Sequence, residues 1–316
     1  MKEKTILQGP RLQNISIVLV KIKKKPEEIV NALLNYDLSI LNEDLCELLL
    51  TILPKEDELI DLKAVKDLSS YSKCDKFLSE ICEVIGFKER LKTIQIKYQF
   101  ENNFNILCDK INQLKNILNK FTNDKRINDW LTIILAFGNY LNGQSMRGGA
   151  YGFKLDSLCK IVELKSNDNK ITLLEFIIEW IYDNNDPSLL EVDLNYTKNT
   201  SLKVTKEFLN DIKGSFKTVK MLKDITKDVD SEKDKSKEFL LFYDEIIDKL
   251  NQKEKELNEI NNEYEKLVLS FGEKIQDMTF ERFFQIFTSF FDNVQLIKEK
   301  VDRKRKMLAR KNKKKS

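Results

Sequence analysis

The sequence predicts an all-α protein, and three observations carry that prediction. Apolar side chains recur at helical spacing through most of the 316 residues, beginning with Leu12, Ile15 and Leu19. Only four prolines and nine glycines occur, so few interruptions of regular structure are expected. Charged residues make up 33% of the chain, above the roughly 25% that is usual for globular proteins. This balance favours an elongated helical protein whose helices have wide solvated faces.

The first part of the chain predicts helices that are separated by prolines. Apolar positions at helical spacing continue from residue 11 and break at Pro26. The segment 42–53 begins with Asn42, a capping residue followed by acids, and stops before Pro54. We therefore expect short helices throughout residues 11–53.

The middle of the chain predicts longer helices. Their ranges are 57–69, 74–85, 87–121 and 124–142. Turn residues near Gly86 and at positions 123–124 separate them. Thr172 and Glu175 form a capping box that begins a further apolar helix.

After about residue 200 the apolar positions alternate by three and four residues. Three such runs span 202–219, 239–271 and 280–301. Turn residues at 228–234 and 272–279 separate them, so we expect an antiparallel three-helix coiled-coil bundle. A parallel dimeric coiled coil is the alternative, but hairpin returns bury the seams within one chain.

The net charge of +3 combines a mildly acidic body with a basic tail. From Arg303 to Lys315 the tail holds nine Lys or Arg and no acid; the other 45 bases stand against 51 acids. A dedicated nucleic-acid domain is basic across a face, so no specific nucleic-acid partner is expected. We interpret the tail as a solvated helix end, with filament sides, anionic lipid or nuclear import as alternative roles.

Histidine is absent, which removes the commonest general base and most zinc sites. Five cysteines occur without C-x-x-C spacing, and four of them lie in apolar helical patterns that predict buried free thiols. No signal peptide opens the chain, and no apolar run approaches the roughly 18 residues of a membrane span. We predict a cytoplasmic protein that is not an enzyme and holds no cofactor or metal.

One segment is unusual, because five of the nine glycines fall between Gly138 and Gly152. A phosphate-binding loop is disfavoured, since G-x-x-x-x-G-K-[ST] is absent and no strand precedes the glycines. Tyr140, Arg147 and Tyr151 are residue types that often anchor protein interfaces. These residues alone favour a structural elbow and a protein-docking surface equally.

The same segment carries a resemblance to a known family. The run G-N-Y-L-N-G, followed by R-G-G-A-Y-G-F-K-L-D-S-L, resembles the signature of the formin homology 2 domain. Two other segments agree in order and spacing. One is R-L-Q-N-I-S-I-V-L from Arg11, followed by the leucine-rich stretch that ends at Pro54; the other is L-K-S-N-D-N-K-I-T-L-L from Leu164 to Leu174. The resemblance extends from about Gln8 to the basic tail.

The resemblance implies an all-helical protein with knob, coiled coil and post regions, after a lasso and linker. In such domains two chains form a ring that holds the barbed end of an actin filament, nucleates filaments and stays attached during growth. It divides this chain into a linker remnant (1–10), a knob-like region with the start of the coiled coil (11–120), a post-like region (121–198), coiled-coil helices (199–302) and the basic tail (303–316).

The resemblance also implies which residues bind actin. The family's actin-contacting isoleucine falls on Ile17, and its actin-contacting lysine falls on Lys165. Without the resemblance, Ile17 would be interpreted as a core residue and Lys165 as a solvated charge. Supporting contacts are expected from Asn14, Lys21, Lys23 and Lys24.

The post-like region is expected to receive the lasso of a second formin chain. The residues expected to shape that surface are Gly138, Asn139, Tyr140, Asn142, Gly143, Arg147, Gly148, Gly152 and Phe153.

No segment of this sequence resembles the lasso, a complete linker or a proline-rich tract. The only tryptophans, Trp130 and Trp180, lie in the body of the chain. We therefore expect impaired ring dimerisation and processivity, with actin binding retained. The alternative function is a coiled-coil scaffold that binds partners other than actin.

Overall fold

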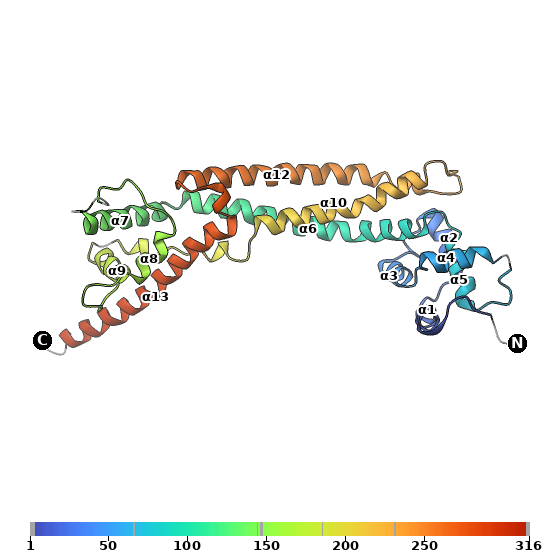
Figure 1. Ribbon diagram of the computed structural model, residues 1–316, viewed down its shortest axis with the longest axis horizontal. Coiled ribbons are helices and arrows are strands. Elements are labelled where there is room, and N and C mark those ends of the chain that lie inside the picture. The colour runs from blue at the N-terminus through green and yellow to red at the C-terminus, as the bar shows by residue number, and fades with distance from the viewer. Residues whose placement is uncertain are drawn as a thin grey trace. The chain divides into compact units, whose positions relative to one another are not determined.

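The computed structural model describes residues 4–65, 67–143, 145, 148–184, 186–230 and 232–313. Within these ranges the chain forms thirteen α-helices and three short 3-10 helices, with two isolated β-bridges and no named strand (Figure 1). The prediction of an all-α protein is therefore confirmed. No helix of this described part has the length and apolar character that crossing a bilayer requires.

The chain divides into two compact units, each built from two stretches. Unit 1 comprises Met1–Cys108 and Glu207–Glu254, and unit 2 comprises Asp109–Lys206 and Lys255–Ser316. Three long helices contribute residues to both units: α6 (Phe87–Asn123), α10 (Leu202–Ile225) and α12 (Phe242–Ser270). A long helix can belong to both units because it offers separate contact surfaces along its length; the five consecutive segments expected from the sequence stay a prediction.

Five short helices precede α6 in unit 1. They are α1 (Gly9–Lys21), α2 (Pro26–Asn35), α3 (Glu43–Thr51), α4 (Glu56–Ala64) and α5 (Lys73–Cys82). Helix α5 packs against α1, α2 and α4, so it forms the centre of this group. The capping role predicted for Asn42 is confirmed, since its side chain accepts a hydrogen bond from the Leu45 amide at 2.9 Å.

The residues before α1 are packed in unit 1. The Lys4 amide donates to the Ser70 carbonyl at 3.0 Å, and the Leu7 side chain is buried. The buried Asp75 carboxylate accepts from the Ile6 and Leu7 amides at 3.3 and 3.4 Å. Residues 4–8 are thus held against α5. The buried carboxylate that holds them lies 68 residues further along the chain.

In unit 1, parts of α6, α10 and α12 pack together. The Phe216 ring of α10 lies 6.0 Å from Phe100 of α6 and 5.8 Å from Tyr243 of α12, between ring centroids. Ion pairs join Lys213 to Glu254 at 2.7 Å and Lys223 to Asp244 at 3.7 Å. Residue numbers rise along α10 as they fall along α12, so these two helices are antiparallel.

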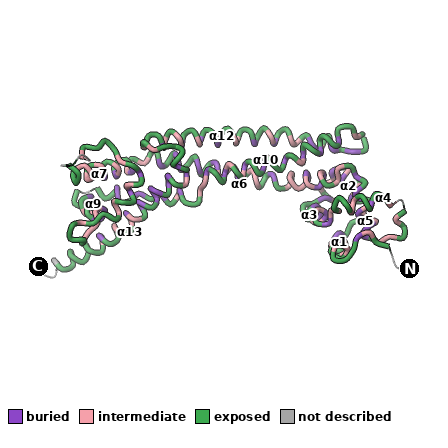
Figure 2. The backbone as a smooth tube through the Cα atoms, viewed as in Figure 1, coloured by how far each residue is buried: buried purple, intermediate pink, exposed green. Residues whose placement is uncertain are grey.

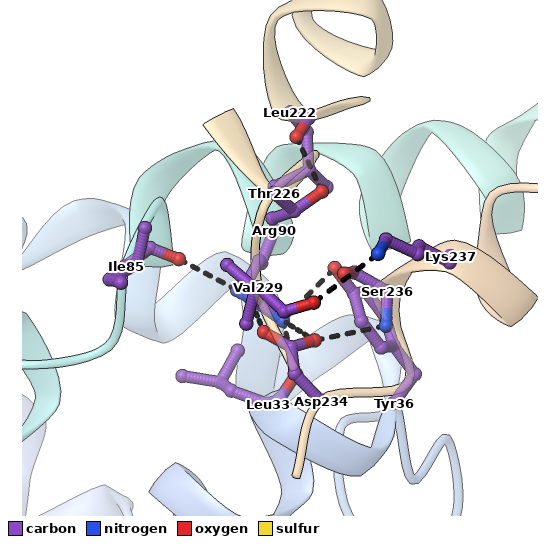
Figure 3. A network of polar contacts seen from close by, with 10 residues as sticks. All are labelled: Leu33, Tyr36, Ile85, Arg90, Leu222, Thr226, Val229, Asp234, Ser236 and Lys237. Carbon is purple, nitrogen blue, oxygen red and sulfur yellow. Dashed lines mark hydrogen bonds and ion pairs between the residues drawn. The ribbon is translucent and has the colours of Figure 1, made fainter. Parts of the chain in front are cut away.

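A buried ion pair fastens the connection between α10 and α12 to the start of α6 (Figure 3). The Arg90 guanidinium donates to both carboxylate oxygens of Asp234, one of them at 2.9 Å, and its Nε donates to the Ile85 carbonyl at 2.8 Å. Arg90 also lies 5.4 Å from the centroid of the Tyr36 ring, which stacks on Phe239 at 4.1 Å. A segment between two long helices is therefore held by a charge in the core.

Unit 2 is organised around α13 (Phe280–Lys313). Its other helices are α7 (Lys125–Asn142), α8 (Ser157–Glu163), α9 (Leu173–Asp183), η1 (Pro187–Glu191) and η2 (Asn195–Thr197), with η3 (Ile275–Asp277) before α13. Helix α13 packs on α8, α9 and η1. Figure 2 shows buried residues where these helices meet.

The third apolar run packs on α12, as expected, and also on helices that were not expected. At the start of α13, Phe283 and Phe287 contact Phe121 of α6 at 5.5 and 4.9 Å between ring centroids, and Phe271 of α12 lies beside them. Beyond this cluster α13 packs on α8 and α9. In unit 1 the helix that packs with α10 and α12 is α6, whereas the sequence pattern predicts the run at 280–301 in that role. The apolar stripes of these helices are similar in the sequence, so the pattern does not specify which helices pack against each other.

The cysteines are free thiols, and three of them are buried: Cys46, Cys74 and Cys82. Cys108 is half-buried and Cys159 is exposed. Burial raises the pKa of the Cys46 and Cys82 thiols to about 12. These two behave as small apolar residues of the core.

Candidate functional site

One face of α1 is fixed to the rest of unit 1. Ile15 is fully buried, and the Ser16 hydroxyl lies 3.2 Å from the Cys74 sulfur of α5. Arg11 pairs with Glu58 at 3.1 Å and donates to the Leu53 carbonyl at 2.6 Å. These contacts determine which side of α1 faces solvent.

The opposite face of α1 carries the predicted contact residue Ile17. Its side chain is 52% exposed, and Asn14 and Lys21 are exposed on the same side. Positions 14, 17 and 21 are three and four residues apart, which places them on one helical face. Ile17 is therefore not a core residue, and the interpretation made from its residue type alone is wrong. Val20, on the same face, is 80% exposed and was missed, although its spacing of three residues from Ile17 was a usable signal.

Basic residues follow this face immediately. Lys23 and Lys24 are exposed just beyond the end of α1, and Lys24 makes an exposed pair with Glu28 at 3.8 Å. An exposed pair of this kind contributes little to stability and leaves the ammonium accessible. The result is an apolar centre bordered by positive charge, which suits an apolar groove with an acidic edge on a partner.

Lys165 lies in a tight turn between α8 and α9. The Ser166 amide donates to the Ile171 carbonyl at 2.9 Å, and the Leu173 amide donates to the Leu164 carbonyl at 2.7 Å. These two bonds bring the two sides of the turn together and present Lys165 on its exposed side.

Side chains in the same turn hold its shape. The Ser166 hydroxyl donates to the Asp168 carboxylate at 2.6 Å, and Lys170 pairs with that carboxylate at 3.1 Å. Hydrogen bonds from Ser166 and Lys170 lower the pKa of Asp168 below its usual value. The Lys170 ammonium is thus paired within the turn, whereas Lys165 is exposed to solvent on a turn that hydrogen bonds hold in place.

The glycine-rich segment folds back onto the end of α7. The Asn139 side chain donates to the Ala150 carbonyl at 2.9 Å and accepts from the Ala150 amide at 2.8 Å. The Cβ of any residue at position 148 would lie 2.9 Å from the backbone oxygen of Asn142 and 2.9 Å from the Cα of Gly143. Glycine at 148 is therefore required by the close approach of the backbone.

The folded segment exposes aromatic side chains. Tyr140 is 85% exposed and Tyr151 is fully exposed, while Phe153 is half-buried and Gly152 is exposed. Tyr140 follows Asn139 and Tyr151 follows Ala150, the two residues that hydrogen-bond to each other. Arg147 lies outside the described residues. The segment is consequently both an elbow and an exposed aromatic surface, so the two sequence interpretations are compatible.

Two more aromatic residues belong near this surface and were not singled out from the sequence. Phe176 and Trp180 of α9 are partly exposed, and both rings contact Phe137 of α7, at 5.8 and 5.7 Å between centroids. The sequence placed them only in the apolar helix that begins at the Thr172 capping box. The strip Phe137, Phe176 and Trp180 extends the exposed aromatic surface from α7 to α9.

The end of α13 is attached to α9 by a ladder of ion pairs. Lys300 pairs with Glu175 at 2.7 Å, Lys304 with Glu179 at 2.8 Å and Arg305 with Asp183 at 3.0 Å. The acids recur every four residues, so they lie along one side of α9. The basic tail continues the last helix as expected, but Lys304 and Arg305 are paired and the solvated-end interpretation applies only beyond them.

Comparison with known proteins decides the family. The family model described as the Formin Homology 2 Domain matches residues 1–295. The chain belongs to the formin homology 2 domain family. Among curated relatives, it is 30% identical to "Disheveled-associated activator of morphogenesis 2" of Gallus gallus over 97% of this chain and 29% of the relative. It is 29% identical to "Disheveled-associated activator of morphogenesis 1" of Homo sapiens, over 95% of this chain and 28% of the relative.

A third curated relative is also similar over nearly the whole chain. The chain is 29% identical to "Formin-like protein 1" of Mus musculus, over 97% of this chain and 28% of that protein. This formin homology 2 domain thus spans less than a third of the length of these relatives. Within it, the α1 face lies in unit 1, while Lys165 and the glycine-rich segment lie in unit 2.

Proposed function

We propose that this formin homology 2 domain binds actin, and that Ile17 is the central apolar contact. The observation that carries the proposal is the exposure of Ile17 on a helix whose opposite face is fixed by Ile15 and Arg11. An exposed isoleucine that the fold does not need is free to enter a groove on a partner. Asn14, Lys21, Lys23 and Lys24 border it and favour an acidic partner surface.

Lys165 supplies the second contact in this proposal. Its turn is held by backbone hydrogen bonds and by Asp168, so the backbone at Lys165 loses less freedom on binding than it would in a loose loop. A single exposed ammonium acts through charge, and its contribution should fall as salt rises.

The glycine-rich segment is proposed to receive a second formin chain. Tyr140 and Tyr151 are exposed aromatic anchors, and Asn139 holds the segment that carries them. A pair of chains would present two Ile17 faces and two Lys165 turns to a filament end. Nucleation or capping of filaments at the barbed end is the activity we infer from this arrangement, in the actin cytoskeleton of the cytoplasm. The role is one of binding, without a catalytic step.

Replacing Ile17 by Ala tests the central contact. We expect actin affinity to fall about tenfold, equivalent to about 1.4 kcal/mol, because a buried interface anchor is truncated. The melting temperature should not change, since Ile17 is not in the core. Affinity is measured with labelled actin, and activity is measured as the rate of bulk actin assembly.

The matched control is Ile60→Ala, which removes another exposed isoleucine (68%, against 52% for Ile17) from α4 of the same unit. For Lys165→Ala the control is Lys160→Ala, an exposed lysine of α8. Equal losses in the site and control variants would contradict the assigned contacts. No effect of the unaltered protein on actin assembly at micromolar concentration would contradict actin binding itself.

A further inference from the structure

Unit 1 contains a groove that none of the contacts proposed above uses. It lies between α2, the end of α5 and the connection that follows α10, and its volume is about 420 Å³. Apolar side chains line it: Val30, Leu34, Val84, Ile85 and Val229. Figure 3 labels Ile85 and Val229 beside the Arg90–Asp234 pair, and Asp234 also lines the groove.

The rim of this groove is negative. Three carboxylates, from Glu27, Glu80 and Glu83, stand against the single ammonium of Lys233. Asp234 also lines the groove, but Arg90 neutralises it. Burial, together with the negative charges of Glu27 and Glu83, raises the pKa of Glu80 above its usual value. The carboxylates therefore repel one another, and a cation placed among them would relieve that repulsion.

The chain itself contains a segment of the matching chemistry. The last turns of α13, beyond Arg305, carry Met307 and Leu308, which are 64% and 52% exposed. Lys306 and Arg310 flank them and are exposed. The ion-pair ladder on α9 ends at Arg305, so these later residues extend past the contacts that hold α13. Two apolar side chains between basic ones complement an apolar groove with an acidic rim.

We propose that this groove binds the end of α13 from a second copy of the chain. Met307 and Leu308 would cover the apolar floor formed by Val30 and Ile85, and Lys306 and Arg310 would face the carboxylates of the rim. The contact is separate from the Ile17 face and from the glycine-rich segment. It adds a second route by which two copies associate.

Charge reversal on each side tests the contact by sedimentation velocity at low salt, without actin. The groove variant is Glu80→Lys with Glu83→Lys, and the tail variant is Lys306→Glu with Arg310→Glu. Each variant alone should self-associate about tenfold more weakly than the unaltered chain, and the difference should shrink as salt rises. The lysines introduced at 80 and 83 lie at the C-terminal end of α5, where the helix dipole favours them, so unit 1 should still fold.

Combining the changes distinguishes this contact from others. A chain that carries all four substitutions should regain association, because the charges are exchanged. Matched controls are Glu47→Lys with Asp61→Lys for the groove and Lys125→Glu with Lys160→Glu for the tail, all exposed residues outside it. None of these substitutions lies in the glycine-rich segment. Any association through that segment should therefore be equal in all variants, and differences between them report on the groove and the end of α13.

Three results would overturn the proposal. One is equal association by the reversed and control variants. Another is failure of the four-fold variant to recover although its melting temperature is unchanged. The third is a tail that binds only vesicles of phosphatidylcholine and phosphatidylserine, or only actin, with no dependence on the residues at 80 and 83.

Discussion

Ile15 and Ile17 lie two residues apart on α1, yet one is fully buried and the other is 52% exposed. The difference arises because successive helical residues point about 100° apart, and because Ser16 and Arg11 hold the Ile15 side against α5 and Glu58. The same principle separates Lys165 from Lys170, which occupy one turn but differ in having a carboxylate partner. The role available to a side chain is set by what its neighbours already occupy.

The buried Arg90–Asp234 pair gives a prediction at this scale. Arg90→Ala leaves the Asp234 carboxylate buried without its partner, so we expect the free energy of unfolding to fall by about 3–5 kcal/mol. Urea unfolding followed by circular dichroism measures the change. The double variant Arg90→Met with Asp234→Leu removes both charges and should recover most of the loss. A decrease of less than about 1 kcal/mol in Arg90→Ala would show that the pair is not important for stability.

The same pair predicts a dependence on pH. Burial tends to raise the pKa of Asp234, but hydrogen bonds from Arg90 and from the Ser236 amide outweigh it and hold the pKa below its usual value. As pH falls, the unfolded state takes up the proton first. The stabilisation is therefore complete above that usual value and is lost as pH falls through the pKa of the folded state.

Unfolding experiments on the unaltered chain and on Asp234→Asn, at pH values from about 7 to about 3, test this dependence. We expect the difference in unfolding free energy between them to shrink toward the acidic end. A difference that stays constant over this range would mean that Asp234 is not the group that titrates.

Helix ends and connections determine what the elements of this protein present to solvent. The end of α7 and the glycine-rich segment are joined by Asn139, and Leu155 is held in turn because its amide donates to Glu273 at 2.9 Å. The end of α13 is held by acids of α9 up to Arg305. In both places a few side-chain contacts hold a loop or a helix end in one position and so determine which residues it exposes.

Two glycines of the predicted second-chain surface should respond oppositely to alanine. An added Cβ at Gly138 meets nothing within 4 Å, so Gly138→Ala should stabilise α7 by about 0.5–1 kcal/mol. Gly148→Ala forces a Cβ to within 2.9 Å of backbone atoms and should destabilise the protein by about 1–3 kcal/mol. Thermal unfolding measures both changes, and Gly152→Ala, which also meets nothing within 4 Å, is the control.

Gly138→Ala also tests the proposed second-chain contact. If another chain approaches α7 at Gly138, this variant should self-associate more weakly although its fold is more stable. Unchanged association, measured by sedimentation at the same concentration, would remove Gly138 from the contact.

Local patterns predicted where most helices lie, but they predicted the residues at which the helices end less accurately. The range predicted as 124–142 is observed as Lys125–Asn142, because Asp124 caps the start with a side-chain bond to the Arg126 amide. The range predicted as 57–69 ends at Ala64, since nothing in the local pattern marks where its packing on α5 stops. The ladder between α9 and α13 joins residues about 120 apart, and spacing along the chain carried no signal of it.

At the scale of the whole molecule, the candidate contacts are distributed between two compact units. Ile17 belongs to unit 1, and Lys165 belongs to unit 2 with the glycine-rich segment. The long helices α6, α10 and α12 supply residues to both. A partner that binds at both Ile17 and Lys165 would therefore contact residues that are supported by two different compact units.

This distribution predicts how paired substitutions combine. Ile17 and Lys165 belong to different compact units, so the losses of actin affinity from Ile17→Ala and Lys165→Ala should add within about 0.5 kcal/mol. The double variant is measured against both single variants with labelled actin at one salt concentration. A deviation of more than about 1 kcal/mol would show that the two contacts are coupled or that they act on different actin sites.

The sequence by itself determined that the protein is all-helical, where most helices lie, and that it carries the formin homology 2 motifs, because these features depend on residues close together in the chain. It also singled out Ile17 and Lys165, which stay predictions. Only the tertiary structure decided that Ile17 faces solvent, that Arg90 finds Asp234 across 144 positions, and that α6 joins α10 and α12. Helical periodicity shows that a face is apolar, but the partner of that face is selected by packing among all the seams at once.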